Sequence, residues 1–213
     1  MLPALIPEAH FPVPLRQAAA AIQHLCSRGV QPENMILTGD SAGGNLTLQV
    51  LLHVLHPLEG IPKIEASKFA GAYLMSPWLT LRPREKRSQK CFRENGMWDI
   101  ISPGLIDDFA RETLSGIKDD RHLPYIDYYF APSGWYDNMG AFTKGLLITA
   151  GRYECFRDDI IEFAQKVENE VDVQLIVDKC GVHDDPLFDF IGRESKLGDV
   201  TAQIISWCHN MFM

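Results

Sequence analysis

The amino-acid sequence predicts an α/β fold with a mostly parallel sheet and flanking helices. Four short apolar runs, at residues 35–37, 69–75, 145–150 and 173–177, are typical of buried strands. Helical patterns lie beside them, at 15–28, 46–55, 156–170 and 197–211. Strands that alternate with helices pair in parallel and carry helices on both faces of the sheet. The length of 213 residues and the hydrophobic content of 46% fit one large domain, with or without an insertion.

The first part of the chain leads into a helix. Residues 2–11 are broken by prolines and should be extended, and Gly29 is placed to end the helix at 15–28. The residues whose helical spacing predicts a core-facing stripe are Leu15, Ala18, Ala19, Ile22 and Leu25. His53 and His56 lie three apart near the end of the helix at 46–55. They could form a metal pair, but no third ligand is near, and cations at a helix C-terminus are the favoured interpretation.

The regular pattern stops between the second and third predicted strands. Residues 79–143 contain short helical patterns, the clearest at 103–114, and an accumulation of aromatic side chains from Tyr125 to Tyr136. We expect this segment to be a lid-like insertion over the sheet, within a single domain that spans residues 1–213. A polar loop at 178–186 follows the last predicted strand.

Charge and cysteine content exclude several classes of protein. The 20 Lys and Arg residues against 28 Asp and Glu residues give a net charge of −8, and no basic block stands out. Nucleic acid and anionic membranes are therefore not expected partners. Five scattered cysteines without a C-x-x-C motif indicate reduced, mostly buried thiols in a cytoplasmic protein. The sequence shows no secretory leader and no run long enough to span a bilayer, and it predicts no metal site and no cofactor.

One pentapeptide, Gly39-Asp40-Ser41-Ala42-Gly43, lies between a predicted strand and a predicted helix. A G-x-S-x-G sequence in this context is typical of a nucleophile elbow, where a serine occupies a sharp, strained turn. The free N–H groups at the start of the helix, that of Ala42 first, would face the serine hydroxyl. The alternative is a loop that merely contains a serine.

Acidic and basic side chains follow the third and fourth predicted strands. Because the carboxyl ends of parallel strands meet at one edge, Ser41, Glu154 and His183 should gather there. His183 could take the serine proton, although a loop histidine beside two aspartates could also be exposed or bind a metal weakly. Glu154 comes directly after its strand and can reach a neighbouring loop. Asp158 is the alternative acid, in the first turn of a helix where acids also complement the dipole.

These residues resemble the hormone-sensitive-lipase-like group of α/β-hydrolases. Residues 39–45, Gly-Asp-Ser-Ala-Gly-Gly-Asn, are similar to its nucleophile motif, and residues 7–12 to its L-A-P-E-x-x-F-P-A segment. Residues 150–158 are similar to its A-G-x-x-D-x-L-x-D loop, whose first acid is the triad member and falls on Glu154, with Glu in place of the usual Asp. Gly181-Val182-His183 is similar to its G-x-x-H, with a spacing one residue shorter.

The resemblance implies an α/β-hydrolase fold and a serine hydrolase that cleaves small-molecule carboxylic esters through an acyl-enzyme on Ser41. It implies a triad of Ser41, Glu154 and His183, with the Ala42 N–H as an oxyanion donor and no cofactor. Candidate pocket walls are Trp78, Trp98 and Trp135.

The family's H-G-G-G loop, which supplies oxyanion donors, should lie upstream of residue 7. We therefore expect the fold to be truncated at its N-terminus, with the nucleophile strand as a sheet edge. A chain without that loop should have little activity, at about 3–4 kcal/mol per missing donor. The alternative is a non-catalytic α/β-hydrolase-like binding or interaction protein.

Overall fold

The computed structural model describes residues 6–65, 68–81, 90–193 and 196–213. Its centre is a four-stranded sheet with the order β1-β2-β3-β4, in which every neighbouring pair is parallel. The strands are β1 (Ile36–Asp40), β2 (Gly71–Met75), β3 (Leu146–Gly151) and β4 (Val173–Asp178). The predicted parallel sheet is confirmed. Its carboxyl ends lie side by side, with Asp40 opposite Met75 and Gly151 opposite Asp178.

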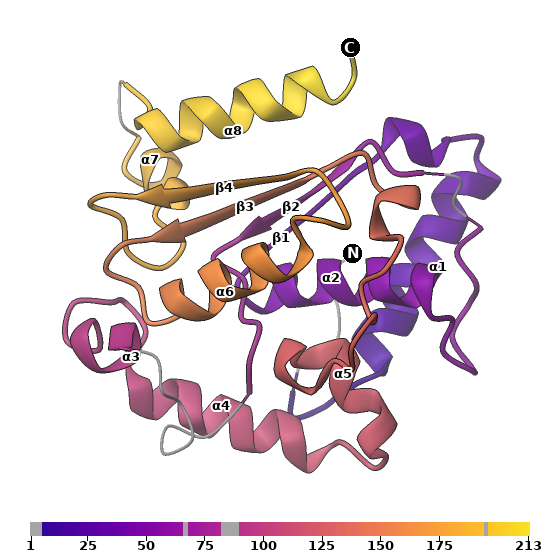
Figure 1. Cartoon of the computed structure of the whole chain (residues 1–213), viewed down its shortest axis with the longest axis horizontal. Helices are drawn as coiled ribbons and strands as arrows, with labels where there is room; N and C mark the ends of the chain where they lie inside the picture. Colours follow the sequence, from indigo (N-terminus) through magenta and orange to yellow (C-terminus); the bar gives the residue numbers. More distant parts are fainter. Residues whose placement is uncertain (1–5, 66–67, 82–89, 194–195) are drawn as a thin grey trace.

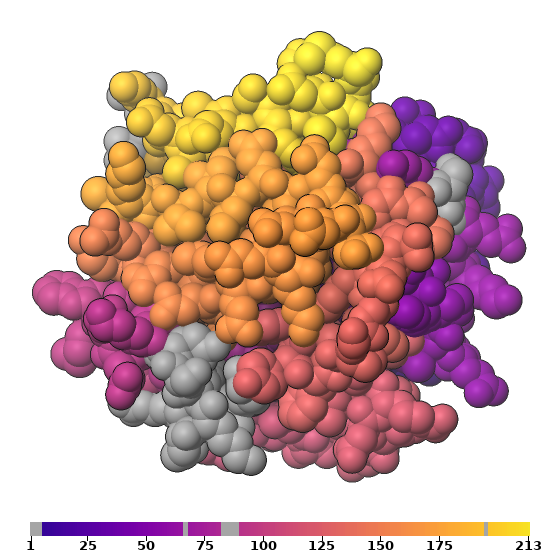
Figure 2. All heavy atoms as spheres, viewed as in Figure 1, coloured from indigo at the N-terminus to yellow at the C-terminus, as the bar shows by residue number. Residues whose placement is uncertain are grey.

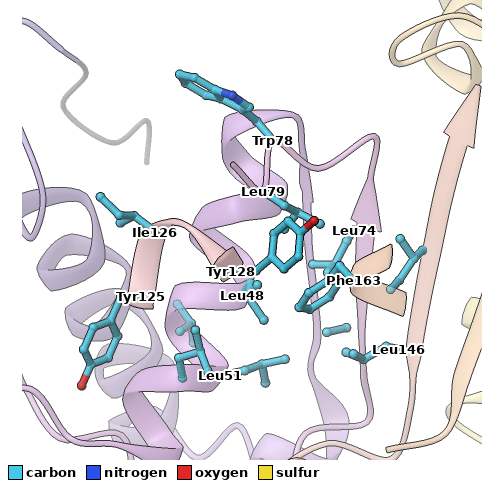
Figure 3. Close-up of a cluster of buried hydrophobic side chains, with 14 of the residues drawn as sticks. Leu48, Leu51, Leu74, Trp78, Leu79, Tyr125, Ile126, Tyr128, Leu146 and Phe163 are labelled. Atoms are coloured by element: carbon cyan, nitrogen blue, oxygen red, sulfur yellow. The ribbon is translucent and has the colours of Figure 1, made fainter. Parts of the chain in front are cut away.

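Helices cover both faces of the sheet (Figure 1). On one face lie α1 (Val13–Ser27), α2 (Ala42–Leu55) and α6 (Arg157–Val167), and on the other lie α7 (Pro186–Ile191) and α8 (Asp199–Asn210). The main core packs Leu48, Leu74, Leu146 and Phe163 between the sheet and the first group of helices (Figure 3). A smaller cluster, in which Trp207 meets Tyr73 and Leu147, holds α8 on the opposite face. The two-faced burial explains why the β2 and β3 sequences are continuously apolar.

The first helix matches its prediction closely. Pro14 lies in its first turn, and Gly29, at φ +91, reverses the chain at its end. Leu15, Ala19 and Ile22 are buried, but the expectation for Leu25 is wrong, because 44% of this side chain is exposed. Its carbonyl accepts the N–H groups of Arg28 and Val30, so Leu25 belongs to the terminal turn where the chain leaves the core.

The segment between β2 and β3 is helical in its described part. It contains α3 (Lys90–Glu94), α4 (Pro103–Ser115) and α5 (Leu123–Ile126), with single 3-10 turns at Asp120–His122, Tyr128–Phe130 and Met139–Ala141. The predicted helix at 103–114 is α4. α5 lies against α2 and α3 lies against α6, and all three helices are on the far side of α2 and α6 from the sheet (Figure 1). Residues 82–89 of the expected insertion and residues 1–5 of the expected domain lie outside the described residues.

The space-filling view (Figure 2) shows how the segments divide the surface of the molecule. The C-terminal segment forms one end and the insertion forms the opposite end, with residues of α6 and β4 between them (Figure 2). No helix within the described ranges is long and apolar enough to cross a bilayer. All five cysteines are free thiols, of which Cys91 and Cys155 are buried and Cys180 is exposed, so the expectation of mostly buried thiols is wrong.

The interpretation of His53 as a helix-terminal cation is also wrong. His53 is buried, its Nδ1 accepts the N–H of Leu58 at 3.0 Å, and its Nε2 lies 3.0 Å from the carbonyl oxygen of Pro62. A ring nitrogen that accepts an N–H carries no proton, so the ring is neutral and donates through Nε2. His56 stacks on Trp135, and its Nε2 lies 2.7 Å from the carbonyl oxygen of that residue. Both histidines therefore bind the backbone of loops, His53 at residues 58–62 and His56 at Trp135.

Candidate active site

Ser41 occupies the turn between β1 and α2 in a conformation that L-residues rarely adopt. Its φ and ψ are 50° and −114°. The strain is held by three backbone hydrogen bonds: the Ser41 N–H donates to Met75 at 2.9 Å, and its carbonyl accepts from Asn45 at 3.1 Å and Trp78 at 3.0 Å. The serine hydroxyl does not cap α2. A strained serine that the surrounding backbone fixes in place is what an elbow requires.

Two glycines make this turn sterically possible. A Cβ atom on Gly39 would lie 2.2 Å from the carbonyl carbon and oxygen of Gly43, and one on Gly44 would lie 2.9 Å from the Cβ of Pro77. A Cβ on Gly43 would meet nothing closer than 3.8 Å. The close contacts are therefore those of strand with helix at Gly39, and of helix with the residues after β2 at Gly44. The sequence motif pointed to Gly39 and Gly43, whereas packing requires Gly39 and Gly44.

Asn45, at the end of the Gly-Gly-Asn sequence, ties the elbow to the insertion. Its buried Nδ2 donates to the carbonyls of Trp78 at 2.6 Å and Ile126 at 2.8 Å, and its Oδ1 accepts from Gln49 at 2.7 Å. One amide thus joins α2, the chain after β2 and α5. A buried amide that is satisfied on both sides fixes its neighbours firmly.

A cavity of about 170 Å³ adjoins the start of α2. Ala42 and Gly43 form its wall next to Ser41, and its remaining wall is mostly apolar, with Trp78 and Ile126 among the lining residues. Ala42 is the first residue of α2, so its N–H has no acceptor within the helix. Of the three expected tryptophan walls, Trp78 lines this cavity. Trp135 instead lines another cavity, where it stacks on His56, and Trp98 is 72% exposed and does not line either of these cavities.

Glu154 lies in the turn after β3 and is fully buried. Its Oε2 accepts a hydrogen bond from the Ser76 hydroxyl at 2.7 Å. Burial raises the pKa of Glu154 to about 8, against the lowering effect of the Ser76 hydrogen bond and with further raising by the charges of Asp99 and Asp184. The carboxyl group is therefore held where its neutral form is favoured.

His183, in the loop after β4, is brought to Glu154. The alternative of an exposed loop histidine is wrong, since only 3% of its side chain is accessible. Its Nδ1 lies 3.9 Å from Glu154 Oε2 and its Nε2 lies 3.2 Å from Asp184 Oδ2, while Phe156 packs edge-on against the ring. Burial lowers the pKa of His183, and the charges of Asp99 and Asp40 oppose that effect. The Nδ1 contact is longer than a hydrogen bond, and such contacts often shorten when substrate binds.

Asp158, the alternative acid, lies elsewhere. Its carboxylate pairs with Arg157, at 2.8 Å, and accepts the N–H of Cys91 at 2.9 Å. The contact with Cys91 joins the first turn of α6 to α3. No ion pair connects Asp158 with His183, both of which the structure describes, whereas Glu154 and His183 are adjacent.

Two residues near this pair, Ser76 and Asp99, had not been singled out from the sequence, and Asp184 had been considered only as a neighbour of His183. Ser76 follows β2 as Ser41 follows β1, so its place at a strand's carboxyl end was a usable signal. Ser41, Ser76 and Asp184 all have positive φ, at 50°, 41° and 56°. Asp99 lies in the insertion, far from both loops in sequence, and gave no signal.

A family model described as the alpha/beta hydrolase fold matches residues 4–185. LipR of Mycobacterium tuberculosis, which is named as an acetyl-hydrolase without that activity being established, is 28% identical over 162 residues, 76% of this chain and 45% of LipR.

Two solved structures are also similar. An esterase/lipase from an uncultured bacterium has a TM-score of 0.73 and 26% identity, over 98% of this chain and 62% of that one. An esterase of the bacterial hormone-sensitive lipase family has a TM-score of 0.74 and 24% identity, over 97% of this chain and 62% of that one, and shows the fold. The chain thus spans less than half of LipR and less than two thirds of each solved chain.

We predict that the two motif glycines will respond differently to the same substitution. Gly39→Ala should lower the free energy of unfolding by about 1–3 kcal/mol or more, because its Cβ would overlap the backbone of Gly43. Gly43→Ala should be neutral or slightly stabilising, because its Cβ has space and alanine is the better helix former. Chemical denaturation of both variants checks this, and equal losses would contradict the steric argument.

Proposed function

This chain belongs to the alpha/beta hydrolase fold family, and from that premise we propose that it is a serine hydrolase that cleaves carboxylic esters through an acyl-enzyme. Ser41 is the nucleophile, His183 the general base and Glu154 the acid of the triad. The observation that carries the proposal is the buried Glu154–His183 pair, which lies at the same sheet edge as the strained Ser41 turn. The esterase names of the similar structures support the same chemistry.

The two ring nitrogens of His183 divide the work. Because Nδ1 faces Glu154, Nε2 is the nitrogen left to take the Ser41 proton. That proton passes to the leaving alcohol as the acyl-enzyme forms, and water then releases the acid in the reverse sequence. The Ala42 N–H, at the positive end of α2, donates to the oxyanion. At present Nε2 contacts Asp184, and that contact has to give way when Ser41 uses the base.

The adjoining cavity fits the acyl group of the substrate. Its wall beside Ala42 is apolar, and its volume of about 170 Å³ suits an acyl chain of modest size. We therefore propose short-chain esters as substrates. No feature of the described residues favours the alternative of a non-catalytic binding protein.

We further propose a cytoplasmic protein that has no nucleic-acid partner. The support is the set of five free thiols and the net charge of −8 without a basic block. That the segment at 79–143 forms a lid over the site is likewise a proposal, supported by the hydrogen bond from Asn45 to the carbonyl of Ile126.

The first test is covalent labelling. A fluorophosphonate probe should modify the protein once, on Ser41, and peptide mapping by mass spectrometry should locate the adduct. Ser41→Ala is the matched control and should not react. Folded protein that remains unmodified at Ser41 would refute the nucleophile assignment.

We predict that Glu154→Gln abolishes ester turnover far more completely than Asp158→Asn does. Loss of the triad anion costs roughly four orders of magnitude in the serine-protease case on which this comparison rests. Asp158→Asn removes a contact between α6 and α3, so it should cost about 1–3 kcal/mol of stability and leave turnover near that of the wild type. Turnover of a short-chain nitrophenyl ester and denaturation curves measure both effects. A folded Asp158→Asn variant that is the crippled one would reverse the assignment of the acid.

The raised pKa of Glu154 predicts activity that grows with pH toward about pH 8. The active form needs an ionised Glu154 and a neutral His183, and because the pKa of His183 is lowered, Glu154 sets the acid limb. The pH profile of kcat/KM measures this, and an acid limb below pH 6 would contradict it.

The free energy of unfolding should change with pH in the opposite direction to the activity. The folded state keeps a proton that the unfolded state loses above pH 4.5, so this contribution to stability falls as pH rises through about 8.

A further inference from the structure

We propose that Asp99 is a positioning residue for this reaction: one carboxylate from the insertion grips both the loop that carries Glu154 and the loop that carries His183. The inference rests on the proposed function. The Oδ2 of Asp99 accepts the N–H of Cys155, the residue after Glu154, at 2.6 Å. Its Oδ1 accepts the N–H of His183 at 3.1 Å and that of Ile100 at 2.8 Å.

The loop that carries Glu154 is hydrogen-bonded through both the carbonyl and the N–H of one peptide group. The Glu154 carbonyl accepts from the Nδ2 of buried Asn95 at 2.8 Å, while the N–H of the same peptide group, that of Cys155, donates to Asp99. Asn95 also donates to the carbonyl of Arg152, at 3.1 Å. Asn95 and Asp99 belong to one turn, since the Asp99 N–H donates to the Asn95 carbonyl at 2.9 Å. The peptide plane from which the Glu154 side chain projects is therefore fixed.

The sheet by itself does not extend this far. Beyond β3 and β4, backbone hydrogen bonds continue from Arg152 to Asp178 at 2.8 Å and from Tyr153 to Gly181 at 2.9 Å. Asp99 adds the next link, to His183. The reacting pair is still 3.9 Å apart, so a small displacement of either loop decides whether a hydrogen bond forms.

Asp99 also belongs to the group of carboxylates that surround the imidazole. Glu154 faces Nδ1, Asp184 faces Nε2, Asp99 binds the backbone N–H of His183, and the charge of Asp40 also acts on the ring. The negative charge of Asp99 raises the pKa of both Glu154 and His183. Removing it lowers both pKa values, so the acid limb of the rate profile moves to lower pH. A buried carboxylate that lies far from the pair would not move that limb.

The test compares Asp99→Asn with Asp127→Asn. Asp127 is a matched control because it is buried, lies in the same insertion, and likewise accepts N–H groups from its own turn, Tyr129 at 2.9 Å, and from a distant residue, Leu81 at 2.8 Å. In Asp99→Asn we expect kcat to fall about 10–100-fold with little change in KM, because the loops lose their register. The acid limb and the NMR-measured pKa of His183 should both move to lower pH. In Asp127→Asn the stability should fall while the His183 pKa stays that of the wild type.

Two further measurements keep the outcome decisive. Asp99→Glu preserves the charge but displaces the oxygens, so kcat should fall while the His183 pKa changes little. In the unmodified protein, the amide hydrogens of Cys155 and His183 should exchange slowly with solvent. A folded Asp99→Asn variant with wild-type kcat and an unmoved His183 pKa overturns the proposal. If the variants do not fold, rapid exchange of the Cys155 and His183 amides in the unmodified protein overturns it. The titration and the exchange need no esterase activity, so they separate failure of the positioning role from failure of the proposed function.

Discussion

The close approach of β1 and α2 at Gly39 is the constraint on which the other features of the site depend. A side chain at that position would occupy the space of the Gly43 backbone, so strand and helix can meet at this angle only without one. The meeting forces Ser41 into positive φ and aims the free N–H groups of α2 at the sheet edge. It also brings Asn45 within reach of Trp78 and Ile126, which joins the insertion to the elbow.

The second requirement of the site is a titratable pair in a place where water does not reach. Burial shifts the pKa of Glu154 upward and that of His183 downward, so the resting pair favours two neutral groups. The proposed chemistry instead needs the carboxylate form of Glu154, because the carboxylate stabilises the positive charge that appears on the imidazole during the reaction. The Ser76 hydroxyl at 2.7 Å and a backbone hydrogen bond with Gly151 favour the carboxylate form. Burial thus destabilises the charged forms of Glu154 and His183, but it also strengthens the electrostatic interactions of these charges with neighbouring groups.

Much of the fold could be predicted from sequence because strand, helix and turn signals are local. The four apolar runs became β1 to β4, and Gly29 follows the end of the first helix as expected. Ser41, Glu154 and His183 could be named because parallel strands place their carboxyl ends at one edge. That they form a working triad stays a prediction, as does the truncation of the fold.

What the sequence could not provide depends on contacts between distant segments. The neutral state of His53 is set by Leu58 and Pro62, and the need for glycine at 44 is set by Pro77. Neither partner can be identified from periodicity. Leu25 has the helical spacing of a core residue but belongs to a turn that runs past the core, so 44% of it is exposed. These errors share one cause. The sequence pattern identifies which residues lie on one face of a helix or strand, whereas tertiary packing decides which residues that face contacts.

The described part of the insertion belongs to the framework of the site. It contributes the Ile126 carbonyl to Asn45 at the elbow, the Asn95 amide to the Glu154 peptide and the Asp99 carboxylate to the His183 loop. Each of the three elements that carry the proposed triad is thus hydrogen-bonded to the insertion. A segment held at three points cannot shift at one without straining the others, so any movement of 79–143 as a lid would have to leave residues 95–99 and 126 in place. Between these anchors, α4 exposes Leu105 and Phe109 to solvent.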